Sequence, residues 1–377
     1  MTSRRTTRDK LPTAQGYRMP AEWEPHESTW LAWPHLRSDW PGKFEPIPWV
    51  YAEIIRNLAR HERVDLIVND ASGEKQARAV LEKAAALSDT LAENVRFHRW
   101  RTDRVWTRDS GCIFLKPPAE RRSGDRAASG PVALHFRFNA WAKYPNYKFD
   151  EKNGEDMAQA ANARVVKPFV VDSFKDKHRV VLEGGSIDVN GRGTLITTEE
   201  CLLSTTQQRN PSMDRAAYEK LFADYLGVQS VIWLDSGIAG DDTHGHVDDI
   251  TRFVAPNTVV TMVEPNERSD NHAPLHANLG RLKNARTADG QKLEIVELPM
   301  PRPVVFKGRQ LPASYANFYI ANGAVLVPVF NDPNDRIALN TLVKLFPTRE
   351  IVPIYSGDLI WGFGALHCMT QQQPAKR

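Results

Sequence analysis

Residues 361–374 read Trp-Gly-Phe-Gly-Ala-Leu-His-Cys-Met-Thr-Gln-Gln-Gln-Pro, and the rest of the chain is organised around them. Two glycines precede Cys368, and glycine lets a backbone turn sharply or approach a ligand closely. A polar Thr-Gln-Gln run follows soon after, so we expect Cys368 to display its thiol in a loop. Cys112 and Cys201 have apolar neighbours, which is typical of buried structural cysteines.

The composition indicates an enzyme of the cell interior. Three cysteines, an odd number in 377 residues, argue against a disulfide framework and predict a reducing, cytoplasmic location. The chain has no apolar run long enough to span a bilayer, and its basic N-terminus lacks the apolar segment of a signal peptide. The net charge of +3, with basic and acidic residues well mixed, gives no indication of nucleic-acid binding.

Helical and extended patterns alternate after the N-terminus. We expect a disordered tail over residues 1–16, one α/β domain over 17–377, and a mobile surface loop over 117–130, which lacks apolar periodicity. Apolar periodicity predicts helices over 48–60, 74–86, 214–226 and 337–346, and strands over 29–33, 63–68, 95–100, 194–198, 259–263 and 324–329.

Five polar loops occur where strands are expected to end. They contain Asp109, Glu183, Asp248, Asn317 and Cys368, at irregular separations of roughly 50 to 75 residues. This spacing is too irregular for a solenoid, but it suits a propeller-like ring whose repeats each place one polar loop near the axis.

Two of these loops carry groups suited to binding a flat cation and moving a proton. Trp106 lies three residues before Asp109, and a guanidinium can stack on an indole while it donates two hydrogen bonds to a carboxylate. The alternative is a surface turn in which Arg108 pairs with Asp109. In residues 241–249, an extended strand would put His246 and Asp248 on one face, as an acid/base pair.

The 241–249 segment also allows other interpretations. His and Asp are common metal ligands, and a capped turn with solvated acids would need no ligand at all. A zinc site would require a third ligand, and His244 joins the same face only if the strand continues through Gly245. We therefore expect no metal.

A thiol beside two carboxylates implies a cationic substrate. The carboxylates of Asp109 and Asp248 would raise the pKa of Cys368 and suppress the thiolate unless the substrate brings a positive charge. A guanidinium meets this need, because its carbon is electrophilic and its leaving nitrogen needs a proton that His246 could supply.

At this point the sequence resembles the agmatine deiminases, within the wider guanidino-group modifying superfamily that includes bacterial peptidylarginine deiminases. The resemblance covers about residues 17–374 and is specific. The matching stretches are Trp23-Glu-Pro-His26, Trp106-Thr-Arg-Asp-Ser-Gly111, Glu183-Gly-Gly185, Gly245-His-Val-Asp248, Pro312-Ala-Ser-Tyr-Ala-Asn-Phe318, Asn322-Gly323 and His367-Cys-Met-Thr-Gln-Gln372.

The resemblance implies a fold, a reaction and a set of roles. It implies a five-bladed pentein propeller of ββαβ-type repeats around a central channel, without cofactor or metal, that hydrolyses agmatine to N-carbamoylputrescine and ammonia. By the same resemblance Cys368 is the nucleophile, His246 the acid and then the base, Asp109 and Asp248 the guanidinium clamp, Trp106 the stacking surface, and Glu183 and Asn317 pocket residues.

One departure from the family pattern concerns the substrate. Many members carry a glycine run before the Ile-His-Cys, whereas this chain has Gly-Phe-Gly-Ala-Leu-His-Cys, so Phe363 and Leu366 could narrow or reshape the entrance.

The alternatives are a peptidylarginine deiminase, a deiminase of another guanidino compound, an amidinotransferase, a cysteine protease and a silent binding propeller. No arginine could be assigned to the α-carboxylate of free arginine. We expect a small-molecule guanidino partner, no nucleic acid and no membrane, and we leave a homodimer open.

Overall fold

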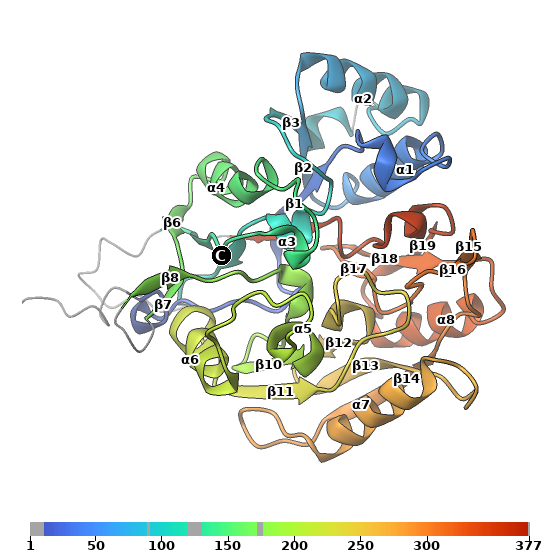
Figure 1. Ribbon diagram of the computed structural model, residues 1–377. Coiled ribbons are helices and arrows are strands. Elements are labelled where there is room, and N and C mark those ends of the chain that lie inside the picture. The colour runs from blue at the N-terminus through green and yellow to red at the C-terminus, as the bar shows by residue number, and fades with distance from the viewer. Residues whose placement is uncertain (1–10, 89–90, 119–129, 172–175, 376–377) are drawn as a thin grey trace, which may run out of the picture.

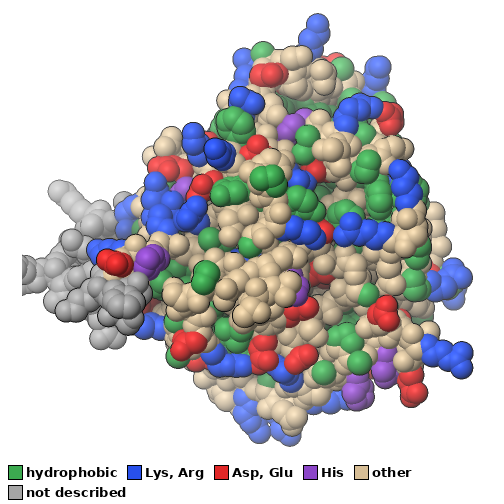
Figure 2. Space-filling view, in the orientation of Figure 1, with side chains coloured by type: hydrophobic (Ala, Val, Ile, Leu, Met, Phe, Trp, Pro, Cys, Tyr) green, Lys and Arg blue, Asp and Glu red, His purple; other side chains and the backbone are tan. Residues whose placement is uncertain are grey.

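The computed structural model describes residues 11–88, 91–118, 130–171 and 176–375. It is a mixed α/β fold in which small sheets surround the centre of the molecule, and helices α1, α2, α4, α6, α7 and α8 lie at the periphery (Figure 1). Basic and acidic side chains are interspersed over the face shown in Figure 2.

Of the seven sheets in the described ranges, five share one connectivity. In the clearest example, β12 (Thr251–Ala255) pairs antiparallel with β13 (Thr258–Val263), and α7 (His272–Asn284) then leads to β14 (Glu294–Pro299), which pairs parallel with β13. Parallel neighbours need such a crossover, since a tight turn can join only antiparallel strands.

Three further sheets repeat this order of antiparallel strand, central strand, helix and parallel strand. Their elements are β4 (Ile113–Leu115), β5 (Val132–Leu134), α4 (Asp150–Ala160) and β6 (Arg164–Val166); β9 (Asp188–Val189), β10 (Thr194–Thr198), α5 (Glu199–Leu203), α6 (Arg215–Leu226) and β11 (Ser230–Leu234); and β17 (Tyr319–Ile320), β18 (Ala324–Val329), α8 (Asp335–Leu345) and β19 (Glu350–Tyr355).

The remaining sheet of this kind joins the two ends of the chain. Its order is β20-β1-β2-β3, in which β1 (His26–Ala32), β2 (Arg63–Val68) and β3 (Val95–Arg99) are parallel. The antiparallel partner of β1 is β20 (Gln371–Pro374), with Thr29 opposite Gln372. Helices α1 (Ile47–Leu58) and α2 (Ala71–Lys83) make the two crossovers, and the two-stranded sheets are β7 (Phe169–Val171) with β8 (Lys177–Arg179) and β15 (Val305–Phe306) with β16 (Arg309–Gln310).

Local sequence explains these elements. In α1 the buried side chains recur at helical spacing, as at Tyr51, Ile54, Ile55 and Leu58, so one stripe of the helix faces the core. Helix α2 begins after Asp70, whose carboxylate accepts a hydrogen bond of 2.8 Å from the backbone N–H of Gly73 and caps the helix.

The structure confirms the expected helices and strands and corrects part of the expected tail. Each expected helix and strand is present, with bounds shifted by at most a few residues. Residues 11–16 do not belong to a disordered tail, because Thr13–Gln15 form a short 3-10 helix whose Thr13 hydroxyl donates to the Asp224 carbonyl at 2.6 Å. In the described part of the chain the sheets do not join into one closed barrel.

The remaining expectations concern the N-terminal tail, the surface loop and membrane-spanning helices. Residues 1–10 of the expected tail, and most of the expected loop at 117–130, lie outside the described residues. Among the helices that the structure describes, none combines the length and the apolar composition needed to cross a membrane.

The pairing of β20 with β1 generates a prediction on stability. A chain that ends at residue 370 lacks β20, including the bond of 3.1 Å from the Trp30 indole N–H to the Gln373 side-chain oxygen. Each net hydrogen bond contributes about 1 kcal/mol, so we expect the free energy of unfolding to fall by about 3 kcal/mol or more. Urea unfolding followed by circular dichroism measures the loss. The control ends at residue 375 and keeps the whole strand; equal midpoints for the two chains would contradict the prediction.

Candidate active site

Short helical turns and loops carry the expected site residues to the centre of the fold. Asp109 lies in α3 (Thr107–Ser110), and Glu183 precedes η6 (Gly184–Ser186). His246 precedes η7 (Val247–Asp249), which contains Asp248. Each turn comes just before or just after a strand of a different sheet, as does the loop of Asn317 and the turn of Cys368.

Asp109 and Cys368 line one cavity of about 370 Å³, and His246, Asp248 and Asn317 lie behind them as their neighbours. Its inner wall includes the side chains of Trp106, Asp109, Trp141 and Cys368. Cys368 is only 4% exposed, so its thiol is not displayed on an open loop as the sequence suggested. It is reached only where it lines the cavity.

Cys368 is surrounded by groups that hold its thiol neutral. The Asn317 amide donates to Sγ at 3.1 Å, and Sγ lies 3.7 Å from Oδ2 of Asp248. Burial, followed by the charges of Asp248, Asp249 and Asp109, raises the pKa of Cys368 well above its ordinary value. These causes favour the neutral thiol of Cys368, and a cation in the cavity would lower its pKa.

His246 has the opposite electrostatic bias. It is fully buried, and its Nδ1 lies 3.9 Å from Oδ2 of Asp109 and 4.0 Å from Oδ1 of Asp248. Burial disfavours the imidazolium, but the charge of Asp109 and further groups raises the pKa of His246 well above its ordinary value. The ring is thus charged at neutral pH and can donate a proton.

The sequence argument for this pair was wrong in one respect. His246 and Asp248 are not on an extended strand, because Asp248 lies in the 3-10 turn η7. The turn nevertheless brings the two side chains together, with His246 Nδ1 4.0 Å from Asp248 Oδ1. His244, the possible third ligand, has a left-handed φ of 65° and its Nε2 lies 3.1 Å from the Ser204 hydroxyl.

Asp109 is held from two sides. The Trp141 indole N–H donates to Oδ2 at 2.9 Å, and the backbone N–H of Gly185 donates to Oδ1 at 3.0 Å. Burial and the neighbouring Asp248 charge, opposed by His246, raise the pKa of Asp109 to about 6. A guanidinium between Asp109 and Asp248 would add a positive charge that favours the ionised form of both carboxylates.

Trp106 forms one wall of the cavity, as expected, and packs against Trp40 with 5.9 Å between ring centroids. The glycine pattern before the nucleophile makes room for this wall. A Cβ added at Gly364 would lie 2.6 Å from the Trp106 ring, a distance that side chains do not tolerate.

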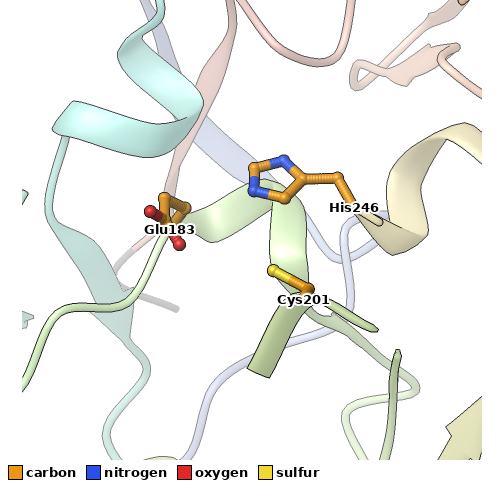
Figure 3. Close-up of side chains that lie close together, drawn as sticks. All are labelled: Glu183, Cys201 and His246. Carbon is orange, nitrogen blue, oxygen red and sulfur yellow. The ribbon is translucent and has the colours of Figure 1, made fainter. Parts of the chain in front are cut away.

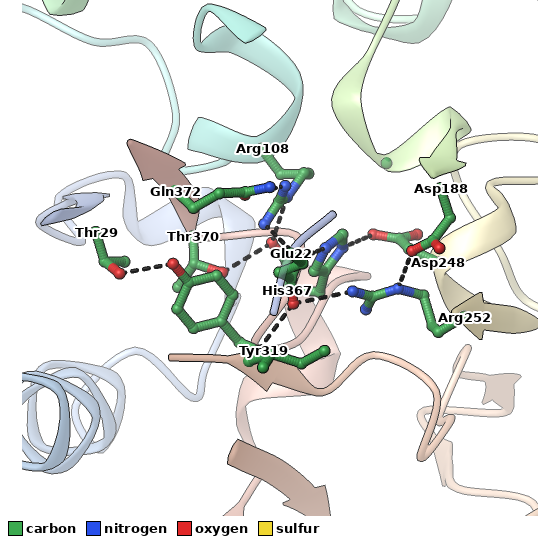
Figure 4. Close-up of polar contacts among 12 residues, drawn as sticks. Glu22, Thr29, Arg108, Asp188, Asp248, Arg252, Tyr319, His367, Thr370 and Gln372 are labelled. Atoms are coloured by element: carbon green, nitrogen blue, oxygen red, sulfur yellow. Dashed lines mark hydrogen bonds and ion pairs between the residues drawn. The ribbon is translucent and has the colours of Figure 1, made fainter. Parts of the chain in front are cut away.

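Asp248 is oriented by a histidine that sequence reasoning did not assign. His367 Nδ1 lies 2.7 Å from Oδ2 of Asp248, and His367 Nε2 lies 2.7 Å from Oε2 of Glu22 (Figure 4). Burial would raise the pKa of Asp248, but the His367 hydrogen bond and the charges of His367, His246 and Arg252 together hold this pKa below its ordinary value. Oδ1 of Asp248 is buried with no hydrogen-bond partner among the described residues, so it can accept from a substrate.

The side chains of Glu183, Cys201 and His246 lie close together (Figure 3). Glu183 is fully buried and accepts from Arg209 Nε at 3.1 Å. Possible ligand atoms of Glu183, Cys201 and His246 lie within 4.8 Å of one another, and so do those of Asp248, Asp249 and Cys368. Arg209 already neutralises Glu183, and the second group is the one that would face a guanidinium. Metal independence remains a prediction.

Other residues at the site were missed because no local signal marks them. Trp141, Asp249 and Glu22 contact site residues only through the tertiary fold. His367 had one usable signal, its position next to Cys368. Of the two residues expected at the entrance, Phe363 lines the cavity, whereas Leu366 is fully buried in the core.

Gly185 generates a prediction on catalytic geometry. A Cβ there would lie 2.6 Å from His246 Nδ1 and 2.9 Å from Asp109 Oδ1. We expect Gly185→Ala to lower kcat by about 100-fold or more, because a displacement near 1 Å can cost that much, while the protein remains folded. Gly280→Ala is the matched control, since nothing lies within 4 Å of its Cβ position. Steady-state kinetics and circular dichroism test both; near-normal kcat in Gly185→Ala would refute the packing argument.

Comparison with known proteins agrees with this geometry. Residues 18–374 match the family described as Porphyromonas-type peptidyl-arginine deiminase. The chain is 34% identical to an agmatine deiminase of Pseudomonas aeruginosa, over 97% of this chain and 98% of the relative.

Solved structures are similar over the same extent. An agmatine deiminase of Enterococcus faecalis superimposes with a TM-score of 0.84 at 27% identity, over 97% of this chain and 98% of that one. A putative arginine deiminase from Porphyromonas gingivalis gives a TM-score of 0.81 at 31% identity, over 96% and 99%. The match to nearly the whole family profile and the 34% identity over nearly all of the chain show that this protein belongs to the Porphyromonas-type peptidyl-arginine deiminase family.

Proposed function

We propose that this protein is an agmatine deiminase, which hydrolyses agmatine to N-carbamoylputrescine and ammonia. One observation carries the proposal: a buried thiol faces Asp109, Asp248 and Asp249 with a charged imidazole nearby. Such a site is matched to a guanidinium, whose charge the carboxylates bind and whose carbon the sulfur attacks. The full-length likeness to agmatine deiminases supports the same substrate.

The first half of the reaction forms a covalent intermediate. Asp109 and the free oxygen of Asp248 hold the guanidinium N–H groups, while Trp106 stacks on its face. The cation favours transfer of the Cys368 proton to water, and Sγ of the resulting thiolate bonds to the guanidinium carbon. The carbon–nitrogen bond then breaks as His246 gives a proton to the leaving ammonia, which leaves a cationic amidino-thioether on the sulfur.

The second half returns the enzyme to its resting state. The now neutral His246 takes a proton from water, and the hydroxide attacks the amidino carbon. The carbon–sulfur bond breaks, the ureido product leaves, and the proton returns to the thiol. Asn317 donates to the sulfur and would stabilise the thiolate as leaving group.

We further propose that the five sheets of common connectivity are the blades of a five-bladed pentein propeller. Support comes from their repeated order and from the site turns that lie between successive sheets. The proposal is that Glu183 orients His246 from behind, and that no metal or organic cofactor takes part.

A peptidylarginine deiminase is the second candidate, because the family profile carries that description. The cavity of about 370 Å³ is near the lower end for small-molecule sites and favours a small guanidine over a protein loop. A cytoplasmic location remains a prediction, supported by three free cysteines. We also still predict that the protein binds neither nucleic acid nor membranes, and we leave a homodimer open.

Substitution of the nucleophile tests the proposed function. We expect Cys368→Ala and Cys368→Ser to abolish ureido product from agmatine, because only the thiolate has the required nucleophilicity. Cys112→Ala is the control; it removes a buried thiol outside the cavity, with a stability loss of about 1 to 3 kcal/mol. Colorimetric detection of the ureido product, in EDTA because we propose that no metal takes part, gives the result. Turnover that survives in Cys368→Ala would refute the mechanism.

The pKa of Asp109 predicts the acid side of the pH profile. As the pH falls through about 6, Asp109 gains a proton and loses the charge that holds the guanidinium. We expect kcat/KM to fall about tenfold per pH unit below this point, as for one essential ionised group. The residual activity of Asp109→Asn should be lower throughout and lack this limb; an unchanged limb would assign it to another group.

A further inference from the structure

Basic side chains surround the outer part of the cavity. Arg104 and Arg309 line the same cavity as Cys368, and Lys143 lies beside them. The sequence offered no arginine for a substrate carboxylate, but the fold brings these two together from positions far apart in the chain. Since Cys368 and Trp106 fix the guanidinium end, these cations face the other end of the substrate.

The acids in this region already have cationic partners. Arg104 forms an ion pair with Asp39, while Lys143 Nζ lies 2.5 Å and Arg309 3.1 Å from Oδ1 of Asp242. Two carboxylates therefore face three permanent cations. Burial also raises the pKa of Asp39 to about 6, which weakens its charge further in mildly acidic solution.

Arg309 is well placed to receive an anion. It lies in β16 of the hairpin β15–β16, and its guanidinium stacks on Phe363 with 3.9 Å to the ring centroid. Its side chain is 49% exposed, and a guanidinium has five N–H donors, so its contact with Asp242 leaves donors for a ligand. Phe363, where this chain departs from its family's glycine run, thus supports an arginine at the cavity.

A second donor lies deeper. The Arg104 side chain is 12% exposed and lies over the Tyr144 ring, and its Nε is buried with no hydrogen-bond partner among the described residues. Buried donors of this kind ordinarily have a partner, so this one is available to an acceptor in the cavity.

We propose that this site also hydrolyses guanidino carboxylates, and that Arg309 is the specificity-determining residue that receives their carboxylate. The inference rests on the proposed deiminase chemistry and concerns only the end of the substrate remote from the guanidinium. A carboxylate on a short alkyl chain is the anionic counterpart of the ammonium of agmatine.

Three matched substrates test this proposal. They share a four-carbon skeleton and differ in the far end: γ-guanidinobutyrate is anionic, n-butylguanidine is neutral and agmatine is cationic. We expect kcat/KM for γ-guanidinobutyrate to exceed that for n-butylguanidine by about threefold to tenfold, the range for a partly exposed ion pair. N-acetylarginine is a second anionic substrate, and its comparison with γ-guanidinobutyrate shows whether the site prefers an arginine skeleton or a simple guanidino acid. A preference for either compound over n-butylguanidine supports the proposal.

Variants assign the effect to Arg309. In Arg309→Gln the ratio of kcat/KM for γ-guanidinobutyrate to that for n-butylguanidine should fall to about one. In Arg309→Glu the kcat/KM for agmatine should rise relative to the values for both of these substrates. Lys307→Gln is the control, because Lys307 is an exposed cation of the same hairpin that does not line the cavity; its ratio should match the wild type.

The outcomes separate the two proposals. Turnover of agmatine and n-butylguanidine without a preference for the carboxylate would overturn the specificity inference and leave the deiminase function standing. A preference that persists in Arg309→Glu would also overturn it. Failure to convert any guanidine would overturn both.

Discussion

A buried ion network centred on Glu22 holds the two ends of the described chain against Asp248. Glu22 lies 2.7 Å from His367 Nε2, 3.0 Å from Arg252 and 3.3 Å from Arg108, and it also accepts from the backbone of Ile320. Burial opposes its charge, but Arg252 and His367 hold its pKa well below the ordinary value. Because an uncompensated charge in the interior costs several kcal/mol, these partners constrain one another's positions. The network thereby fixes His367 and, through it, Asp248.

The electrostatics of the site are incomplete without a cation. The pKa of Cys368 is raised by the same carboxylates that would bind a guanidinium, while the pKa of His246 is raised by Asp109. The resting enzyme therefore pairs a neutral thiol with a charged imidazole. In the proposed mechanism, a ligand that neutralises the carboxylates makes the sulfur nucleophilic, which couples substrate recognition to activation.

The sequence was most informative where one residue pattern determines one local structure. The strands at 63–68, 194–198 and 324–329 have the expected bounds, because continuous apolar runs between polar turns leave little choice. We identified Trp106, Asp109 and Cys368, which line the cavity, from the chemistry of the motifs that contain them. Trp141, Arg309 and Glu22 were not identified, because periodicity shows which side chains are buried and not which buried faces meet. The His246–Asp248 strand failed for a related reason, since a three-residue turn leaves no periodicity to read.

The pairing of β20 with β1 also has a consequence for biosynthesis. Cys368 and His367 lie just before the last strand, and that strand pairs with one of the first to leave the ribosome. Domains tend to fold as the chain emerges from its N-terminus, so the other four sheets can form while the nucleophile is still being synthesised. The Cys368 thiol thus joins its carboxylates only after the β20 segment has been synthesised. A nascent chain can acquire most of its fold without ever acting on a guanidine.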